Sequence, residues 1–134
     1  RIGMEITTGG TIGSLVRIGI YGSSNGLPTN LILDCGTIAG DSATFQSITI
    51  NQALPPGLYY LVALSNSLLN ITFRAIPIAS AQSIMGVSST LGATASGNLI
   101  QSTFTYAALP DPFDNTGIVV ASANVPIISV RLSL

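Results

Sequence analysis

The stretch from Phe45 to Leu64 constrains the fold most strongly, because a double proline separates two runs that both have the pattern of β-strands. Between Phe45 and Asn51 apolar and polar residues alternate, which places Ile48 and Ile50 on one face of a half-buried strand. The segment Leu54–Gly57 then interrupts the pattern with two consecutive prolines. Proline lacks a backbone donor and has a fixed φ, so neither a helix nor a central strand can pass through it and the chain must turn.

The run that follows the prolines, Leu58–Leu64, contains only aliphatic residues and two tyrosines. A continuous apolar run of this length is typical of a strand that is covered on both faces, so we expect a central strand here. A half-buried strand, a proline corner and a buried strand together predict the middle of a β-sandwich.

Short alternating segments continue along the rest of the chain. The clearest is Thr11–Tyr21, where every second residue from Ile12 to Ile20 forms one face and Arg17 and Tyr21 are expected to be exposed or half exposed. Further strands are predicted at Ile2–Thr7, Leu31–Leu33, Asn70–Ala75, Ile100–Tyr106, Ile118–Val120 and Ile128–Leu134. Loops are predicted at Gly22–Asn30, Gly36–Thr44 and Leu109–Phe113.

No segment shows the period of a helix over a helix-like length. We therefore predict an all-β fold, an antiparallel and jelly-roll-like β-sandwich of about eight strands. The 134 residues match the size of one domain, so residues 1–134 are expected to form a single one. Ile78–Gly97 keeps no clean period, and we expect a long surface excursion with about one helical turn, the kind of loop that often carries binding.

The surface of this chain must be unusually apolar, because 47% of the residues are hydrophobic and only 7% are charged. An average soluble domain has about 25% charged residues. No apolar run reaches the ~18 residues of a membrane span, so membrane insertion is not expected. The composition favours association with protein, in a homo-oligomer or in a virion or cell-surface assembly. The alternative is a compact sandwich with an efficient core.

The charged residues exclude several classes of function. Four arginines, five carboxylates and no lysine give a net charge of −1, which cannot form the basic patch that a nucleic-acid partner requires. The chain has no histidine, so it lacks Ser-His-Asp and Cys-His pairs and imidazole metal ligands. The carboxylates are spread over separate segments. We therefore expect no enzymatic activity, no cofactor and no metal.

Each of three local features has a structural and a functional interpretation. Asp111 and Asp114, with Asn115, could contribute to a calcium site, but aspartates in a proline-rich loop more often cap turns. Asn70–Thr72 matches the pattern for glycosylation, although it falls inside a predicted strand. Cys35 is the single cysteine and is expected to be a small buried hydrophobe, since no histidine is present to activate it.

Several turn and strand motifs occur together: Arg17–Tyr21, Gly26–Pro28, Leu31–Asp34 with Gly36 and Thr37, Ile48–Ile50, Leu54–Val62, Tyr106–Pro110, Pro112 with Phe113, and Pro126–Leu132. In this order they resemble a sandwich domain that recurs in tail-fibre and minor virion proteins of tailed bacteriophages. The resemblance covers nearly the whole chain. Members of that family usually have a further strand upstream of the segment that matches Arg1–Thr8, and this chain starts without Met, so a fragment of a longer protein is expected.

The resemblance implies a non-enzymatic structural protein of the virion, located extracellularly on the capsid surface or the tail. It would decorate or cement the capsid, or form part of a fibre that attaches to the host. It also implies a homotrimer, and the composition adds that copies would associate through aliphatic, Tyr, Ser and Thr groups with little help from ion pairs.

The alternative function is a carbohydrate-binding module of a cell-surface or secreted protein, because jelly-roll faces with exposed Tyr and Asn bind sugars. The absence of Trp and an aromatic content of 6% are against it. The partners considered are other copies, other virion proteins and a host-surface glycan. The expected interaction surface consists of Arg17, Tyr21, Asn25, Arg74 and Arg131.

Overall fold

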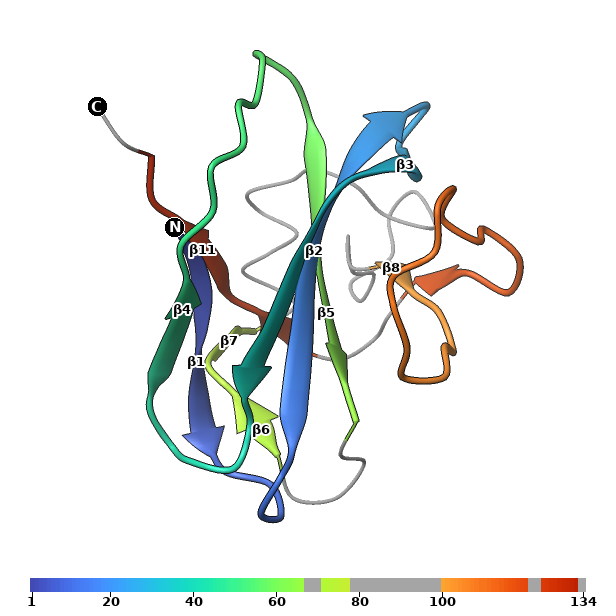
Figure 1. The fold of residues 1–134 in the computed structure, drawn as a ribbon. Coiled ribbons are helices and arrows are strands. Elements are labelled where there is room, and N and C mark those ends of the chain that lie inside the picture. Colours follow the sequence, from blue (N-terminus) through green and yellow to red (C-terminus); the bar gives the residue numbers. More distant parts are fainter. Residues whose placement is uncertain (67–70, 78–99, 121–123, 133–134) are drawn as a thin grey trace.

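A computed structural model of the chain describes residues 1–66, 71–77, 100–120 and 124–132 (Figure 1). Within these residues all regular structure is β-strand, every strand pair is antiparallel, and no helix occurs. The predicted all-β antiparallel fold is therefore confirmed. None of the described residues belongs to a helix that is long and apolar enough to cross a membrane.

The first sheet is built around β1 (Ile2–Thr8). The first half of β1 lies between β11 (Ile128–Val130) and β4 (Phe45–Ile48), and its second half pairs with β6 (Thr72–Phe73). The alternation in the sequence sets which face is buried. Ile2, Met4 and Ile6 are at most 1% exposed, whereas Glu5 between Met4 and Ile6 is partly exposed and binds Arg74.

The second sheet has the order β3-β2-β5. The central strand β2 (Leu15–Ser24) joins β3 (Leu27–Ala39) through a two-residue turn, and β5 (Tyr59–Ser65) pairs with its other edge. The turn residues Asn25 and Gly26 have φ values of 52° and 76°. These left-handed conformations match the twist of a tight hairpin, so the strands extend almost to the turn and the predicted nine-residue loop is wrong.

Two small strand pairs complete the described structure. The strands β7 (Ala75–Ile76) and β10 (Val125–Pro126) pair with each other, as do β8 (Ile100–Gln101) and β9 (Val119–Val120). The strand predicted for Ile100–Tyr106 is therefore much shorter than expected. The predicted excursion Ile78–Gly97 lies outside the described residues.

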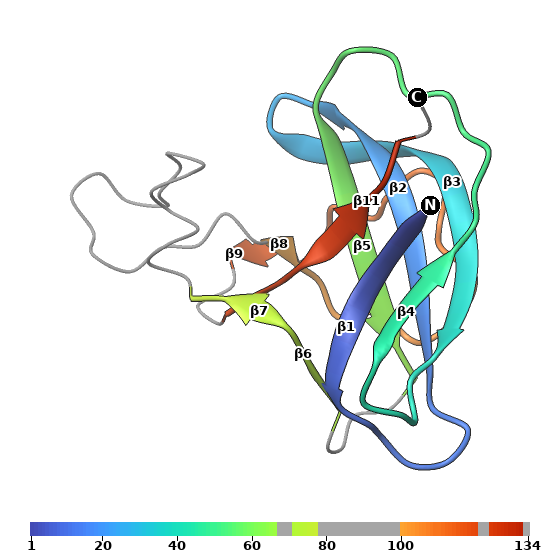
Figure 2. The same cartoon turned by 90° about the vertical axis from the view of Figure 1, so that its left-hand side faces the viewer.

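The two larger sheets face each other across an apolar core, in an arrangement consistent with a β-sandwich (Figure 2). From β2, the side chains of Val16, Ile18 and Ile20 are fully buried against the inward residues of β1. Ile12 was expected on the same face but is 99% exposed, because residues 11–13 form a turn before β2 begins.

The strand that is buried on both faces is β2, and the prediction of a central strand at Leu58–Leu64 is wrong. Among the described strands β5 pairs only with β2, and none of its residues is fully buried. Its tyrosines explain the difference. The Tyr59 and Tyr60 hydroxyls donate hydrogen bonds to the exposed carbonyls of Pro55 and Gly26, so an aromatic-rich run suits the edge of a sheet as well as its centre.

A carboxylate in β2 should therefore prevent folding. Ile18→Asp places an unpaired charge in the core and is expected to lower the free energy of unfolding by more than about 3 kcal/mol. Thr37→Asp in β3 is the control, since this exposed residue lies opposite Arg17. Urea denaturation followed by circular dichroism measures both. An Ile18→Asp protein with the wild-type midpoint would contradict the assignment of β2.

Candidate functional site

The outer face of the second sheet is covered by the loop of residues 102–118. Figure 1 shows this orange segment beside β2 and β3, on the side opposite the first sheet. The loop can approach closely because Gly19 of β2 has no side chain: a Cβ at this position would lie 2.1 Å from Cδ1 of Leu109. A glycine inside a strand is the sequence signal for such a close approach, whereas strand alternation alone does not predict the covering loop.

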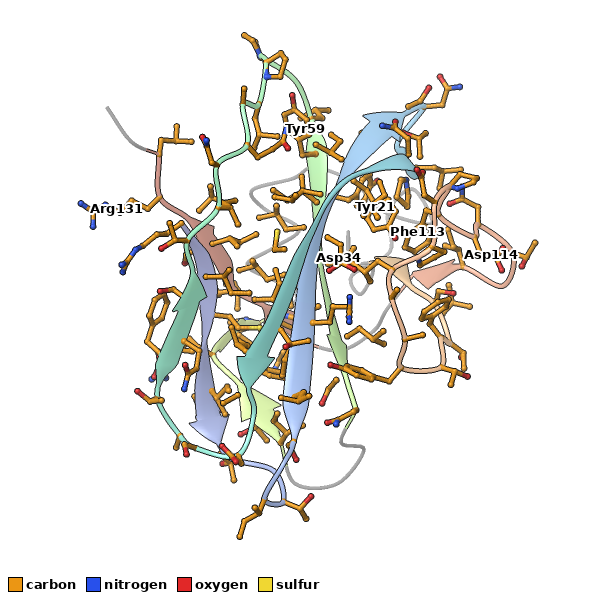
Figure 3. The ribbon with its side chains drawn as sticks, viewed as in Figure 1. Tyr21, Asp34, Tyr59, Phe113, Asp114 and Arg131 are labelled. Carbon is orange, nitrogen blue, oxygen red and sulfur yellow. The ribbon has the colours of Figure 1, made fainter. Side chains whose placement is uncertain are left out.

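Tyr21 is the main contact between β2 and the loop. Its hydroxyl donates a hydrogen bond of 2.6 Å to the Pro110 carbonyl, and its ring packs edge-to-face on Phe113 with centroids 5.1 Å apart (Figure 3). The expected exposure of Tyr21 is therefore wrong, since the residue is 0% exposed. Burial, with the nearby charges of Asp111 and Asp34, raises the pKa of Tyr21 to about 12.

Asp34 links β3, β2 and the loop. Its Oδ2 accepts hydrogen bonds from Arg17 at 2.5 Å and from the Leu109 amide at 3.4 Å, and its Oδ1 accepts one from the Gly36 amide at 3.0 Å. Burial raises the pKa of Asp34, but the hydrogen bonds from Gly36, Arg17 and Leu109 outweigh it, so the pKa lies below its usual value. The Asp34 carboxylate is therefore ionised, and its hydrogen bonds hold Arg17 of β2 and Leu109 of the loop to β3.

A β-bulge places Asp34 in this position. The pairing of β2 with β3 steps from Ile18–Gly36 to Gly19–Asp34, which leaves Cys35 without a cross-strand partner. Gly36 has a φ of 91°, a conformation that favours glycine. The bulge lets Cys35 join the core while Asp34 faces the loop. The buried role predicted for Cys35 is confirmed, and burial raises the pKa of its thiol to about 11.

The remainder of the loop is held to the β2–β3 hairpin by hydrogen bonds that involve the main chain of β3. These bonds run from the Leu31 amide to Asp111 Oδ1 at 2.9 Å, from the Phe113 amide to the Thr29 carbonyl at 2.8 Å, and from Asn115 Nδ2 to the Pro28 carbonyl at 3.1 Å. The loop is therefore a covering layer of the sheet, bound at several points.

Two buried polar atoms on this side lack a hydrogen-bond partner within the described residues. They are Nε of Arg17 and the hydroxyl of Tyr106. The Arg17 side chain is 24% exposed, which confirms the expected partial exposure, but its charge is already paired with Asp34. Arg17 is therefore a structural cation rather than a free one.

A hollow of about 260 Å³ lies between β5 and the loop. Aromatic and aliphatic side chains form most of its wall, including Tyr60, Phe104 and Phe113, and Asp114 and Ser102 are its polar members. Such a lining suits an apolar group. Among the described residues that line it, Ser102 and Asp114 are polar, and none forms a pair of a nucleophile with a histidine base.

The other residues of the expected interaction surface lie elsewhere. Asn25 is in the β2–β3 turn, while Arg74 binds Glu5 of β1 through Nε at 3.0 Å and Nη2 at 2.8 Å. Arg131 follows β11 and lies across the molecule from Tyr21 (Figure 3). The five residues therefore do not form one continuous patch, because they are divided between the two sheets.

Of the two acidic residues in the loop, Asp114 caps a turn, whereas Asp111 binds the Leu31 amide of β3. Asp114 Oδ1 accepts hydrogen bonds from the amide of Thr116 at 2.9 Å and from its hydroxyl at 2.6 Å, and these bonds lower the pKa of Asp114. Among the described residues no three His, Cys, Asp or Glu side chains come together as a metal site. The glycosylation motif cannot be placed, since Asn70 lies outside the described residues.

Comparisons with protein-family models, with curated proteins and with solved structures gave no match for this chain.

Tyr21 of β2 and Tyr106 of the loop should respond differently to loss of the hydroxyl. Tyr21→Phe removes a buried hydrogen bond and leaves the Pro110 carbonyl unpaired, so it should lower the free energy of unfolding by about 1 kcal/mol. The Tyr106 hydroxyl lies near the Arg17 guanidinium but forms no well-aligned hydrogen bond within the described residues, so Tyr106→Phe should cost less stability than Tyr21→Phe. Urea denaturation of both variants tests this difference. Equal losses would contradict the hydrogen-bond assignment at Tyr21.

Stability should also fall at alkaline pH. Folding raises the pKa of Tyr21 from 10.0 to about 12 and that of Cys35 from 9.0 to about 11. Above pH 9 the folded state therefore keeps protons that the unfolded state has lost, and the free energy of unfolding decreases as pH rises. Denaturation between about pH 8 and about pH 11.5 measures the slope. Tyr21→Phe should make the slope shallower, and an unchanged slope would exclude Tyr21 as its source.

Proposed function

We propose that this chain is a non-enzymatic structural module of a tailed-bacteriophage virion, exposed at the capsid surface or in the tail, where it assembles with other copies. The observation that carries the proposal is the combination of an all-β antiparallel fold with a surface poor in charge and rich in apolar groups. Large hydrophobic side chains are open to solvent, with Ile12 99%, Leu58 80% and Leu132 71% exposed.

Three features of the described residues support a structural role over a catalytic one. Four of the nine charged side chains form the ion pairs Arg17–Asp34 and Arg74–Glu5. The acidic residues of the loop accept hydrogen bonds from main-chain amides, Asp111 from Leu31 and Asp114 from Thr116, and the hollow beside β5 has a mainly apolar wall. Exposed apolar side chains on a domain with so few charges favour burial against protein partners.

The place in a virion rests on the resemblance of the turn and strand motifs to tail-fibre and minor virion proteins. The double-proline segment Leu54–Gly57 and the segment Gly26–Pro28 belong to those motifs. The first precedes β5, and the second contains Gly26 of the β2–β3 turn and the start of β3. A capsid-decoration protein and a tail-fibre module are both compatible with this architecture. A trimer is the assembly that the resemblance implies.

The alternative function, carbohydrate binding, has less support. Protein sites for sugars combine an exposed aromatic ring with free polar groups. Here Tyr21 is buried, and the hydroxyls of Tyr59 and Tyr60 are bound to main-chain carbonyls. The most exposed aromatic ring among the described residues is Phe45 of β4, which is 57% exposed and carries no polar group.

Antibody labelling of virus particles tests the proposed function directly. An antibody raised against the purified domain should decorate phage particles from the source of the gene, visible as gold labels on the capsid or tail in electron micrographs. Particles of an unrelated phage are the control. Absence of the protein from purified particles, by labelling and by mass spectrometry, would refute the proposal, and specific binding on a glycan array would then favour the sugar-binding alternative.

A further inference from the structure

All nine charged side chains of the chain lie within the described residues, so the ion pairs that they form with one another can be followed. Two cations, Arg17 and Arg74, are paired with Asp34 and Glu5. The other two cations, Arg1 and Arg131, are exposed and form no ion pair within the described chain. Three aspartates also remain without an ion pair.

The unpaired arginines are neighbours on adjacent strands of the first sheet. The Arg131 amide donates a hydrogen bond of 2.8 Å to the Arg1 carbonyl, which makes the two residues a cross-strand pair. Like charges at such a position repel each other. An anionic partner would remove this repulsion. Figure 3 shows the Arg131 side chain pointing away from the sheet and from the core.

The outer face of the first sheet, on which Arg131 lies, carries small polar residues beside the arginine pair. Ser47 of β4 and Ser129 of β11 are both exposed and flank Gly3 of β1, which is itself buried because the main chain of Gln46 and Ser47 lies against it. No described segment covers this face in Figure 2, whereas the outer face of the second sheet is covered by the loop of residues 102–118. Within the described residues, the first sheet therefore has no layer that corresponds to this loop.

Two of the unpaired aspartates, Asp111 and Asp114, belong to that loop. Each uses Oδ1 for a hydrogen bond within the chain, and both residues are exposed. Asp114 of the loop and Arg131 lie on opposite sides of the two sheets (Figure 3). The charges of one molecule therefore cannot meet each other, but they can meet those of a second copy that is placed head-to-tail.

We propose that Arg1 and Arg131 on the outer face of the first sheet bind the Asp111–Asp114 loop of a second copy. This inference rests on the proposed function and names another copy as the partner of that face. The apolar surface supplies most of the affinity, and the opposite charges select the orientation. A head-to-tail contact of this kind either closes into a ring, as a trimer does, or continues as a filament.

Charge reversal and its rescue test the proposal. Arg131→Glu should weaken self-association by roughly tenfold, because it places a carboxylate against the acidic loop. The double variant Arg131→Glu/Asp114→Lys restores opposite charges and should return to within about threefold of the wild type. Sedimentation velocity over a concentration series measures the dissociation constants.

Two conservative variants distinguish a loss of the proposed contact from a folding defect. Asp114→Asn keeps an oxygen that accepts from Thr116, so it should leave the turn intact and weaken association by roughly threefold. Asp41→Asn removes the same charge from a different loop and should have no effect. At about 1 M salt the charge variants should converge on the wild type, which stays associated through apolar contacts.

The possible outcomes separate this inference from the proposed function. An oligomer whose dissociation constant is the same in all charge variants would overturn the head-to-tail contact and leave the assembly itself in place. A wild-type monomer at all concentrations would overturn the contact and also the proposed self-assembly. Antibody labelling of particles decides independently whether the chain belongs to a virion.

Discussion

The structure depends on the burial of β2 on both faces. Its inner face packs Val16, Ile18 and Ile20 against β1, as in many two-sheet proteins. Its outer face is closed by the chain itself, because Gly19 lets Leu109 approach the strand and Tyr21 holds the Pro110 carbonyl. One strand thus joins three layers, namely the first sheet, the second sheet and the loop.

The scarcity of charge makes each polar group near this layer important. Asp34 accepts hydrogen bonds from a side chain of β2, from the bulge in β3 and from the loop, and one carboxylate thereby orients three segments. A partly buried anion is stabilised only when such donors surround it. The unpartnered Nε of Arg17 and hydroxyl of Tyr106 show that the polar network on this side is incomplete within the described residues.

The outer faces of the two sheets differ, and this difference connects the fold with the proposed assembly. Within the described residues, the loop covers the second sheet, whereas the first sheet exposes Ser47, Ser129, Phe45 and the two arginines that form no ion pair. A loop of a second copy would complete the first sheet in the way that residues 102–118 complete the second. This arrangement fits a protein that works in a repeated structure better than one that encloses a substrate, since the hollow beside β5 has few polar groups to orient a ligand.

The sequence by itself determined the fold class and much of the burial, because strand alternation is local: Ile2, Met4 and Ile6 point inward as their spacing requires. It also determined that Cys35 is buried and that the double proline turns the chain. Only the tertiary structure decided which strand is central, how Tyr21 is covered and where the arginines lie. The pattern of Leu58–Leu64 fits a central strand and an edge strand equally well. Tyr21 is buried by a distant loop, and its hydrogen bond to the Pro110 carbonyl spans 89 residues of the sequence. Such contacts depend on which distant segments meet, and no periodicity within one strand encodes its neighbours.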